Sequence, residues 1–211
     1  MIRQGLYNFL KRLFDIIFSI ILLSVISPFL IILSLVLFLI YGSPIFFLQK
    51  RLGKNCKPFT IIKFKSLLDL YDSNGDSLPE IERLTIIYSL MRSFSIDELP
   101  SLINVLKGDM SLVGPRPLLA EYLSEYNSKQ IKRHDVFPGI TGWAQINGRN
   151  MISWEERFKM DLWYVENQSF YLDIKILLLT FLTILKREGI NQSSISTMEK
   201  FKNKEKNMEK K

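Results

Sequence analysis

Residues 95–117 read SIDELPSLINVLKGDMSLVGPRP, in which two adjacent carboxylates precede an apolar helical pattern and a Gly-Pro-Arg-Pro turn. Ser95 and Glu98 have the S-x-x-E spacing of a capping box, which satisfies free N–H groups at the start of a helix. The apolar residues behind them are spaced for one helix face: Leu99, Leu102, Ile103 and Leu106. A helix N-terminus also favours bound phosphate, because its N–H groups and dipole attract negative charge. We therefore interpret Asp97 and Glu98 both as part of a helix cap and as a candidate site.

The composition fits one compact domain with attached segments, since 211 residues with 47% hydrophobic content can bury one core. The single Cys56 excludes an internal disulfide and a cysteine-based metal cluster, and fits a reducing compartment. The net charge is +7, and the basic tail over 191–211, with six Lys and three Glu in its last thirteen residues, is expected to be disordered. The remaining positive charge fits nucleic acid, an anionic membrane or a phosphorylated small substrate.

An almost wholly apolar run from Phe14 to Tyr41 predicts a membrane segment, because it exceeds the roughly 20 residues that cross a bilayer as a helix. Ser27-Pro28 lies near its middle, where proline removes a backbone N–H and kinks a helix. Basic residues flank both ends: Arg3, Lys11 and Arg12 before it, and Lys50, Arg51, Lys54 and Lys57 after it. If both flanks are cytoplasmic, the segment is a re-entrant helical hairpin bent at Ser27-Pro28, and a kinked single span is the alternative.

Asp15 lies at the mouth of this run, where an unpaired charge is costly. We expect it to pair with Lys11 or Arg12, which precede it by about one helical turn.

Residues 45–67 predict two short strands around a Gly53-Lys54-Asn55 turn. The second strand would carry Lys63 and Lys65 on one side, where they either bind phosphate oxygens or form a solvated face. A helix over 82–94 would then bring Arg92 close to the two acids.

The C-terminal half predicts an amphipathic helix over 118–134 and a Gly-rich loop over 136–150, which is either a ligand-binding loop carrying Arg149 or a surface turn. His134 is the single histidine and has no partner pattern, so we favour a structural role for it. Ser153 and Glu156 form a second capping box before a helix over 153–167. The apolar stretch over 170–189 has Asp173 and Lys175 near its start, which favours an interfacial amphipathic helix over a span.

Three blocks, KFKSL at 63–67, DELPSLINVLKGDMSLVGPRP at 97–117 and PGITGWAQINGRN at 138–150, stand in this order behind the apolar segment. In these blocks the sequence resembles the bacterial sugar transferases, and within them the small monotopic phosphoglycosyl transferases, over roughly residues 11–189. The resemblance implies an α/β, mostly helical, membrane-associated domain with a re-entrant N-terminal helix hairpin (1–41), short strands and interfacial amphipathic helices in a catalytic part (42–190). It places the protein on the cytoplasmic face of the bacterial inner membrane.

The resemblance also implies a reaction. A phospho-sugar would pass from a UDP-sugar to polyprenol (undecaprenyl) phosphate with release of UMP and with Mg²⁺ as cofactor, which starts the assembly of a surface or glycoprotein glycan. By the family pattern Asp97 would be the nucleophile that carries the phospho-sugar and would hold part of the Mg²⁺ shell, while Glu98 would help to deprotonate the acceptor. The cations expected to bind the substrates are Lys63, Lys65, Arg92, Arg116 and Arg149.

Phe137 departs from the family, which commonly has Arg there, so one substrate contact would fall to Arg133 or Arg149. The expected partners are UDP-sugar, polyprenol phosphate and membrane lipids, with no nucleic acid, and the oligomeric state is open. An N-acetylated amino-deoxy sugar such as diacetylbacillosamine is the expected sugar, with N-acetylgalactosamine and galactose as alternatives. A UDP-sugar phosphohydrolase and a membrane-anchored scaffold of a glycan-assembly complex are the alternative functions.

Overall fold

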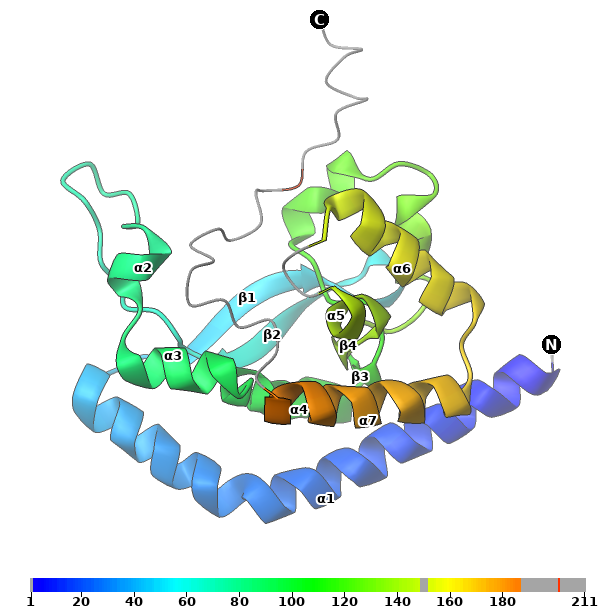
Figure 1. The fold of residues 1–211 in the computed structure, drawn as a ribbon, viewed down its shortest axis with the longest axis horizontal. Coiled ribbons are helices and arrows are strands. Elements are labelled where there is room, and N and C mark those ends of the chain that lie inside the picture. The colour runs from blue at the N-terminus through cyan, green and yellow to red at the C-terminus, as the bar shows by residue number, and fades with distance from the viewer. Residues whose placement is uncertain (1, 149–151, 187–200, 202–211) are drawn as a thin grey trace, which may run out of the picture.

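A single bent helix, α1 (Ile2–Tyr41), lies beneath the rest of the chain in the computed structural model, which describes residues 2–148, 152–186 and 201 (Figure 1). It bends near its middle, so that both ends rise toward the remaining elements (Figure 1). Pro28 lies inside α1 and cannot donate to the carbonyl of Ser24, which instead accepts a 3.0 Å hydrogen bond from Ser27 Oγ. The expected break is therefore a bend within one continuous helix, and the two arms do not fold back on each other as separate helices.

The predicted hairpin is confirmed: β1 (Phe46–Leu52) pairs antiparallel with β2 (Pro58–Phe64), with Phe46 opposite Phe64. The predicted helix over 82–94 is wrong in one respect, because the chain forms two helices, α2 (Glu80–Arg83) and α3 (Ile86–Ser93). Thr85 has extended backbone angles between them and caps α3 by accepting a hydrogen bond from the Tyr88 N–H.

A second, parallel pair of strands joins β3 (Ser111–Val113) to β4 (Gly139–Thr141). A Cβ on Gly114, which follows β3, would lie 2.3 Å from the carbonyl oxygen of Phe137, so the close approach of these segments requires glycine. Part of the predicted Gly-rich loop is therefore a buried strand, and α5 (Trp143–Asn147) follows it directly.

The predicted helix over 118–134 is wrong. The chain forms two short 3₁₀ segments there, η3 (Ala120–Glu125) and η4 (Gln130–His134). Asn127 lies between them, and its side-chain oxygen accepts hydrogen bonds from the N–H groups of Lys129 and Gln130 at 3.0 and 2.9 Å. This local turn competes with a continuous helix.

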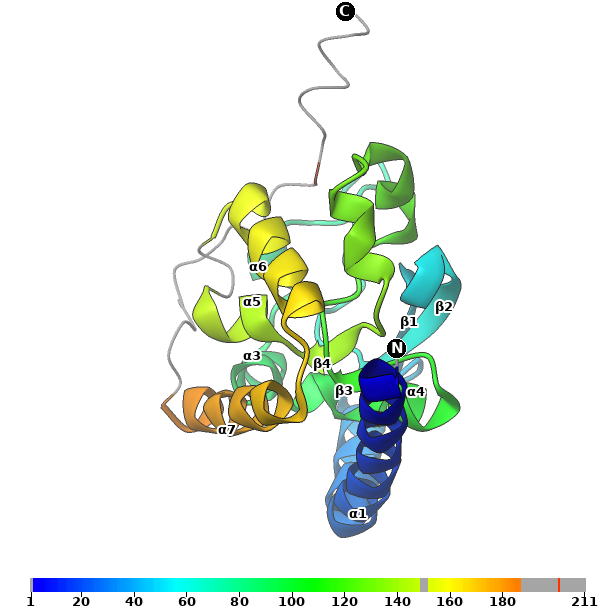
Figure 2. The same ribbon diagram turned by 90° about the vertical axis from the view of Figure 1, so that its right-hand side faces the viewer.

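The two remaining predicted helices are confirmed as α6 (Trp154–Glu166) and α7 (Phe170–Lys186). Ser153 and Glu156 form the predicted capping box at the start of α6. The view along α1 shows α7 beside that helix, with α5 and α6 further from it (Figure 2).

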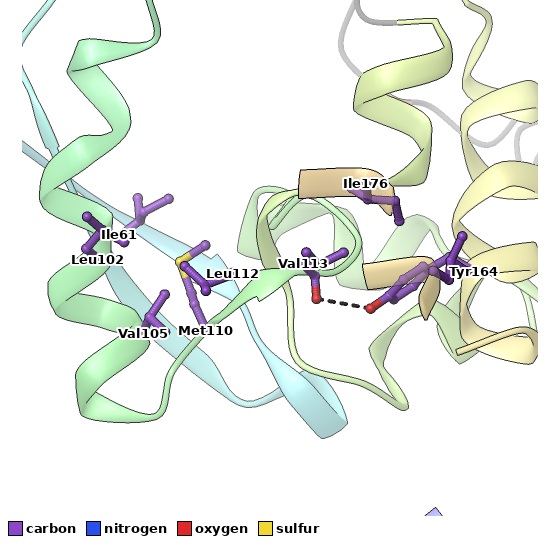
Figure 3. Packing of buried hydrophobic residues seen from close by; sticks show 9 residues of the cluster. Ile61, Leu102, Val105, Met110, Leu112, Val113, Tyr164 and Ile176 are labelled. Carbon is purple, nitrogen blue, oxygen red and sulfur yellow. Dashed lines mark hydrogen bonds between the residues drawn. The ribbon is translucent and has the colours of Figure 1, made fainter. Parts of the chain in front are cut away.

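The main core joins β2, α4 (Leu102–Lys107), β3, α6 and α7 (Figure 3). Tyr164 from α6 donates a 3.1 Å hydrogen bond to the Val113 carbonyl, which ties α6 to β3 (Figure 3). The buried residues of this cluster are Ile61, Leu102, Val105, Met110, Leu112, Val113, Tyr164, Leu172 and Ile176.

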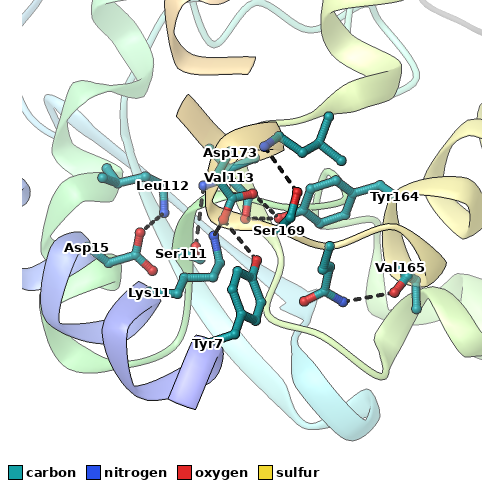
Figure 4. Close-up of polar contacts among 12 residues, drawn as sticks. Tyr7, Lys11, Asp15, Ser111, Leu112, Val113, Tyr164, Val165, Ser169 and Asp173 are labelled. Atoms are coloured by element: carbon teal, nitrogen blue, oxygen red, sulfur yellow. Dashed lines mark hydrogen bonds and ion pairs between the residues drawn. The ribbon is translucent and has the colours of Figure 1, made fainter. Parts of the chain in front are cut away.

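Polar residues of the N-terminal arm of α1 attach it to this core (Figure 4). Tyr7 and Lys11, one turn apart, donate to the Asp173 carboxylate on α7 at 2.9 and 2.8 Å. Asp15 accepts a 3.2 Å hydrogen bond from the Leu112 N–H. The predicted ion pair of Asp15 with Lys11 or Arg12 is wrong as a direct contact, because Lys11 pairs with Asp173 and Arg12 donates to backbone carbonyls of α4. The positive charge of Lys11 still acts favourably on Asp15.

The tail over 191–211 lies outside the described residues except for Phe201. This side chain is 7% exposed and packs against Tyr122, Tyr126, Trp154 and Phe158. At this one position the tail contacts the folded domain.

Candidate active site

The two adjacent acids lie in a 3₁₀ segment, η2 (Ile96–Ser101), and the capping box predicted for them is wrong. Ser95 has left-handed backbone angles (φ 55°) and its side chain caps nothing. Pro100 explains the difference, because proline disfavours α-helical geometry in the residue before it and lacks an N–H of its own. The regular helix α4 begins only at Leu102, and the Glu98 side chain is free to bond elsewhere.

Two buried polar side chains hold η2 and α4 against the edge of β2. Ser101 Oγ donates to the Ile62 carbonyl at 2.8 Å. Asn104 acts like a strand partner: its Oδ1 accepts from the Ile62 N–H at 3.0 Å and its Nδ2 donates to the Thr60 carbonyl at 2.8 Å. These bonds fix the two acids relative to the lysine that follows Ile62 on β2.

Glu98 is fully engaged by two cations. Its Oε1 accepts hydrogen bonds from Lys63 Nζ and Arg116 Nη2, both at 2.6 Å, and its Oε2 accepts from Arg116 Nη1 at 3.3 Å. Burial alone would raise the pKa of Glu98, but the positive charges of Arg116 and Lys63 outweigh it and hold that pKa well below its usual range. Glu98 is therefore ionised at neutral pH.

Asp97 is in the opposite situation. No side chain in the described part of the chain donates a hydrogen bond to its carboxylate. Burial, and then the negative charge of Glu98, raise the pKa of Asp97 to about 6, although Lys63, Arg116 and Arg92 act against this. The result is a partly buried carboxylate whose lone pairs are available to an incoming group.

Both acids line a cleft of about 1030 Å³, together with four of the five predicted cations: Lys63, Lys65, Arg92 and Arg116. Lys65 pairs with Asp69, and Arg92 with Glu80. The fifth, Arg149, lies outside the described residues. Seven Lys or Arg side chains and four Asp or Glu side chains line the cleft, so its charge is positive overall and suits a phosphorylated ligand.

The other wall of the cleft is apolar and comes from helices that carry exposed hydrophobic surface. Phe18 and Leu22 of α1 and Leu177 and Ile184 of α7 line it. One continuous space thus joins the acids to the helix Gly5–Tyr41, which is long and apolar enough to cross a membrane by length and composition.

Three arginines that line the cleft, Arg51, Arg83 and Arg157, were missed from the sequence, and two of them lie near Arg116. Arg51, at the end of β1, was interpreted only as a basic flank of the membrane segment. Arg157, on α6, is 8% exposed, and its guanidinium lies 5.4 Å from the centre of the Trp154 ring. Neither Arg51 nor Arg157 belongs to the three blocks that carry the family resemblance, and the fold brings both near Arg116.

The positions that depart from the family pattern or were left open have structural roles here. Lys54 lies over the ring of Phe137, 4.9 Å from its centre. Arg133 forms a buried ion pair with Asp161 and donates to the Arg116 carbonyl at 2.7 Å, so it supports the backbone of a site residue. His134 is 3% exposed and its Nδ1 lies 3.1 Å from the Gly53 carbonyl oxygen. Burial and the charge of Arg133 lower the pKa of His134 to about 4, so it is neutral at physiological pH.

A magnesium ion fits this site only if the protein and the substrate phosphates both contribute ligands to it. The described residues contain no group of three or more His, Cys, Asp or Glu side chains that could hold a metal. Mg²⁺ commonly binds one or two carboxylates together with substrate phosphates and water. Asp97 can supply that carboxylate, whereas the lone pairs of Glu98 are taken by Lys63 and Arg116.

Known proteins that are similar to this chain include named sugar transferases and sugar-phosphate transferases. The chain is 56% identical over 192 residues to the uncharacterized sugar transferase EpsL of Bacillus subtilis, covering 91% of this chain and 95% of that protein. It is 36% identical to the UDP-N-acetylgalactosamine-undecaprenyl-phosphate N-acetylgalactosaminephosphotransferase of Aeromonas hydrophila, covering 85% of this chain and 44% of that protein. It is 38% identical to the UDP-glucose:undecaprenyl-phosphate glucose-1-phosphate transferase of Escherichia coli K12, covering 84% of this chain and 40% of that protein. It therefore spans less than half the length of these two enzymes. The bacterial sugar transferase family model matches residues 6–187, and the chain belongs to that family.

Proposed function

We propose that this chain transfers a sugar 1-phosphate from a UDP-sugar to polyprenol (undecaprenyl) phosphate. One observation carries the proposal: a single cleft holds an unpartnered carboxylate at Asp97, an excess of positive charge and an apolar wall from α1 and α7. A UDP-sugar matches the charged part, and a lipid phosphate matches the junction of the charged and apolar parts. The Aeromonas and Escherichia relatives are named for this class of reaction.

In the proposed first step, a carboxylate oxygen of Asp97 attacks the β-phosphorus of the UDP-sugar. A bond forms between that oxygen and the phosphorus, the bond from the phosphorus to the bridging oxygen breaks, and UMP leaves with the electron pair. In the second step, a phosphate oxygen of the polyprenol phosphate attacks the same phosphorus and Asp97 leaves. Covalent catalysis lets each substrate use the same site in turn.

Cations are essential to this scheme because a carboxylate must approach an anionic diphosphate. Arg116 and Lys63 are held beside Asp97 by Glu98 and are placed to stabilise the charge that develops on the phosphoryl group. When bound, Mg²⁺ would neutralise further charge on the diphosphate, with Asp97 and the substrate phosphates as its ligands.

Glu98 has two roles in the proposal. In the structure it holds Lys63 and Arg116, and its lowered pKa makes it a weak base there. When a substrate phosphate draws those cations away, the pKa of Glu98 rises, and the carboxylate can then accept the proton of the incoming polyprenol phosphate.

We further propose that α1 enters the membrane and returns to the cytoplasmic face, and that α7 lies in the interface. The outer face of α7 carries Leu178, Phe181 and Leu185, each more than 60% exposed. A helix with such a face and a buried, polar-anchored opposite side is suited to the bilayer surface. This arrangement lets the long acceptor lipid reach the cleft without leaving the membrane.

The test is UMP release by the purified full-length protein in detergent or nanodiscs, with a panel of UDP-sugars, with and without polyprenol phosphate. A transferase forms polyprenol-diphosphate-sugar and releases at most one UMP per protein when the acceptor is absent. Repeated UMP release without acceptor would show a phosphohydrolase, and no release with any UDP-sugar would favour a scaffold. The panel also identifies the sugar.

The nucleophile is tested in the same assay. Asp97→Asn should abolish UMP release and prevent retention of a radiolabelled phospho-sugar on the protein. An Asp97→Asn protein with near wild-type activity would refute this role.

A further inference from the structure

Arg51 combines partial burial, a place in the cleft and the lack of a carboxylate partner among the described residues. Its Nη2 donates to Gln49 Oε1, its Nη1 has a long 3.4 Å contact to the Pro117 carbonyl, and its Nε is buried without a partner. All its acceptors are therefore neutral. By contrast, Arg116 pairs with Glu98, and Arg133 pairs with Asp161.

The surroundings of Arg51 disfavour its positive charge on balance, although Tyr122, Glu98 and Glu121 act in its favour. Burial, and then the positive charge of Arg116, lower the pKa of Arg51 to about 10, which leaves it charged at neutral pH. A guanidinium that is partly desolvated next to another guanidinium, without its own counter-ion, destabilises the protein. Such an arrangement is expected where a bound anion supplies the missing negative charge.

The location of Arg51 favours phosphate as that anion. Arg51 lines the main cleft and also a small space of about 30 Å³ that it shares with Lys63, Glu98 and Arg116. Arg92 acts on Asp97 from the side of α3, whereas Arg51 lies at the end of β1, beside Arg116. The positively charged lining of the cleft therefore includes Arg51 as well as the cations that surround the two acids. A guanidinium matches phosphate through two parallel N–H donors.

We propose that Arg51 binds a phosphate group of a substrate, next to Arg116 and away from the phosphorus that Asp97 attacks. This assignment rests on the proposed function, which gives two possible sources of the phosphate. These are the phosphate of UMP and the headgroup of polyprenol phosphate. Because Arg116 is already paired with Glu98, its charge is partly neutralised, and Arg51 supplies additional positive charge to the bound phosphate.

The experiment compares Arg51→Gln, Arg51→Lys and a matched control, Lys50→Gln. Lys50 precedes Arg51 on β1 and is exposed, so its substitution removes the same charge outside the cleft. Binding of UMP, polyprenol phosphate and inorganic diphosphate to the full-length protein is measured by calorimetry, and thermal unfolding is followed without ligand.

Arg51→Gln should weaken binding of UMP or of polyprenol phosphate about tenfold or more, and the affected ligand identifies the phosphate. Its melting temperature without ligand should equal or exceed that of the wild type, because the repulsion with Arg116 is removed. A purely structural Arg51 would lower stability and leave the affinities unchanged. Arg51→Lys keeps the positive charge but loses the two parallel N–H donors of the guanidinium, so it should bind more tightly than Arg51→Gln and less tightly than the wild type.

The proposal is overturned if Arg51→Gln binds both ligands within twofold of the wild type, or if Lys50→Gln weakens binding equally. If the wild type binds neither UMP nor polyprenol phosphate, the proposed function fails. In that case the binding of inorganic diphosphate tests separately whether Arg51 binds phosphate. Weaker binding of diphosphate to Arg51→Gln than to the wild type supports the proposal, and equal affinities refute it.

Discussion

Two neighbouring carboxylates, one residue apart in the chain, have opposite electrostatic environments. Lys63 and Arg116 stabilise the charge of Glu98, whereas the same ionised Glu98 opposes the charge of Asp97. The pair therefore consists of one carboxyl group that is ionised at neutral pH and one whose pKa is raised to about 6. Perturbed pairs of this kind are typical of catalytic sites.

The raised pKa of Asp97 leads to a pH dependence of the proposed reaction. Only ionised Asp97 is a nucleophile, so the rate of UMP release should rise with pH through about 6 and level off above it. Initial rates between pH 5 and 8 at saturating UDP-sugar measure this limb. A flat profile over that range would contradict the assignment of this pKa to the attacking group.

Substitution of the two acids should change stability in opposite directions. The pKa of Asp97 is higher in the folded state than in the unfolded chain, so its favourable contribution is present at low pH and is lost as pH rises through about 6. Asp97→Asn should therefore raise the free energy of unfolding at pH 8, by about 1 to 2 kcal/mol after allowance for solvent screening. The pKa of Glu98 is lowered, so its contribution is present at neutral pH and is lost on acidification.

Glu98→Gln serves as the comparison for Asp97→Asn. It leaves Lys63 and Arg116 without a counter-ion and should cost about 3 kcal/mol at pH 8. Thermal unfolding of both variants at pH 8 checks the signs. Destabilisation by Asp97→Asn would show that its carboxylate has a structural partner.

At the scale of elements, the site depends on how η2 and α4 attach to β2. The β2 edge offers backbone groups at Thr60 and Ile62 that no strand among the described residues satisfies, and Asn104 bonds to both. This side chain substitutes for a strand and fixes the distance between Glu98 and Lys63. Its place on one face of a short helix gives no hint of this role in the sequence.

Asn104→Ala should therefore destabilise the protein by about 2 to 3 kcal/mol, because two backbone groups of β2 lose their partner in a fully buried position. Activity should fall as well, since Glu98 and Lys63 lose their fixed separation. Ile103→Ala, at a neighbouring residue that is 39% exposed, is the control and should change stability by less than about 1 kcal/mol. Melting curves of the two variants distinguish the effects, and equal losses would contradict the bridging role.

At the scale of the whole molecule, the catalytic part and the apolar helix form one unit. Tyr7, Lys11 and Asp15 recur every four residues along one face of α1 and contact α7 and β3. Arg12 donates to the carbonyls of Val105 and Leu106 at the C-terminal end of α4. The N-terminal arm of α1 is thus attached beside the cleft.

This geometry predicts the topology in a membrane. Because both ends of α1 rise toward the same side of the molecule, a cysteine at residue 5 and one at residue 57 should react with a membrane-impermeant reagent from the same side (Figure 1). Gly5→Cys and Lys57→Cys, each in a Cys56→Ser background, provide the two sites, and both positions are exposed. Labelling from opposite sides would establish a single span and refute the re-entrant proposal.

The sequence by itself determined the features that depend on local patterns. The apolar run with Pro28, the β1–β2 hairpin and the Ser153 cap all follow from hydropathy, turn residues and motif spacing. The helix cap predicted at Ser95 shows the limit of such patterns. The S-x-x-E spacing is present, but Pro100 disfavours a regular helix there and the Glu98 side chain bonds to two cations that are distant in sequence. Asn127 broke a predicted helix in the same way, through side-chain bonds to its own backbone.

Only the tertiary structure decided which charges meet. Lys63 and Glu98 are 35 residues apart in sequence, and Lys11 and Asp173 are 162 apart, so no local pattern encodes these pairs. Arg51 had one sequence interpretation, a basic flank of the membrane segment, because nothing local indicated a place in the site. Packing of β1 against the segment after Arg116 places it in the cleft, where burial and nearby charge give it a different chemistry from the exposed Lys50 beside it.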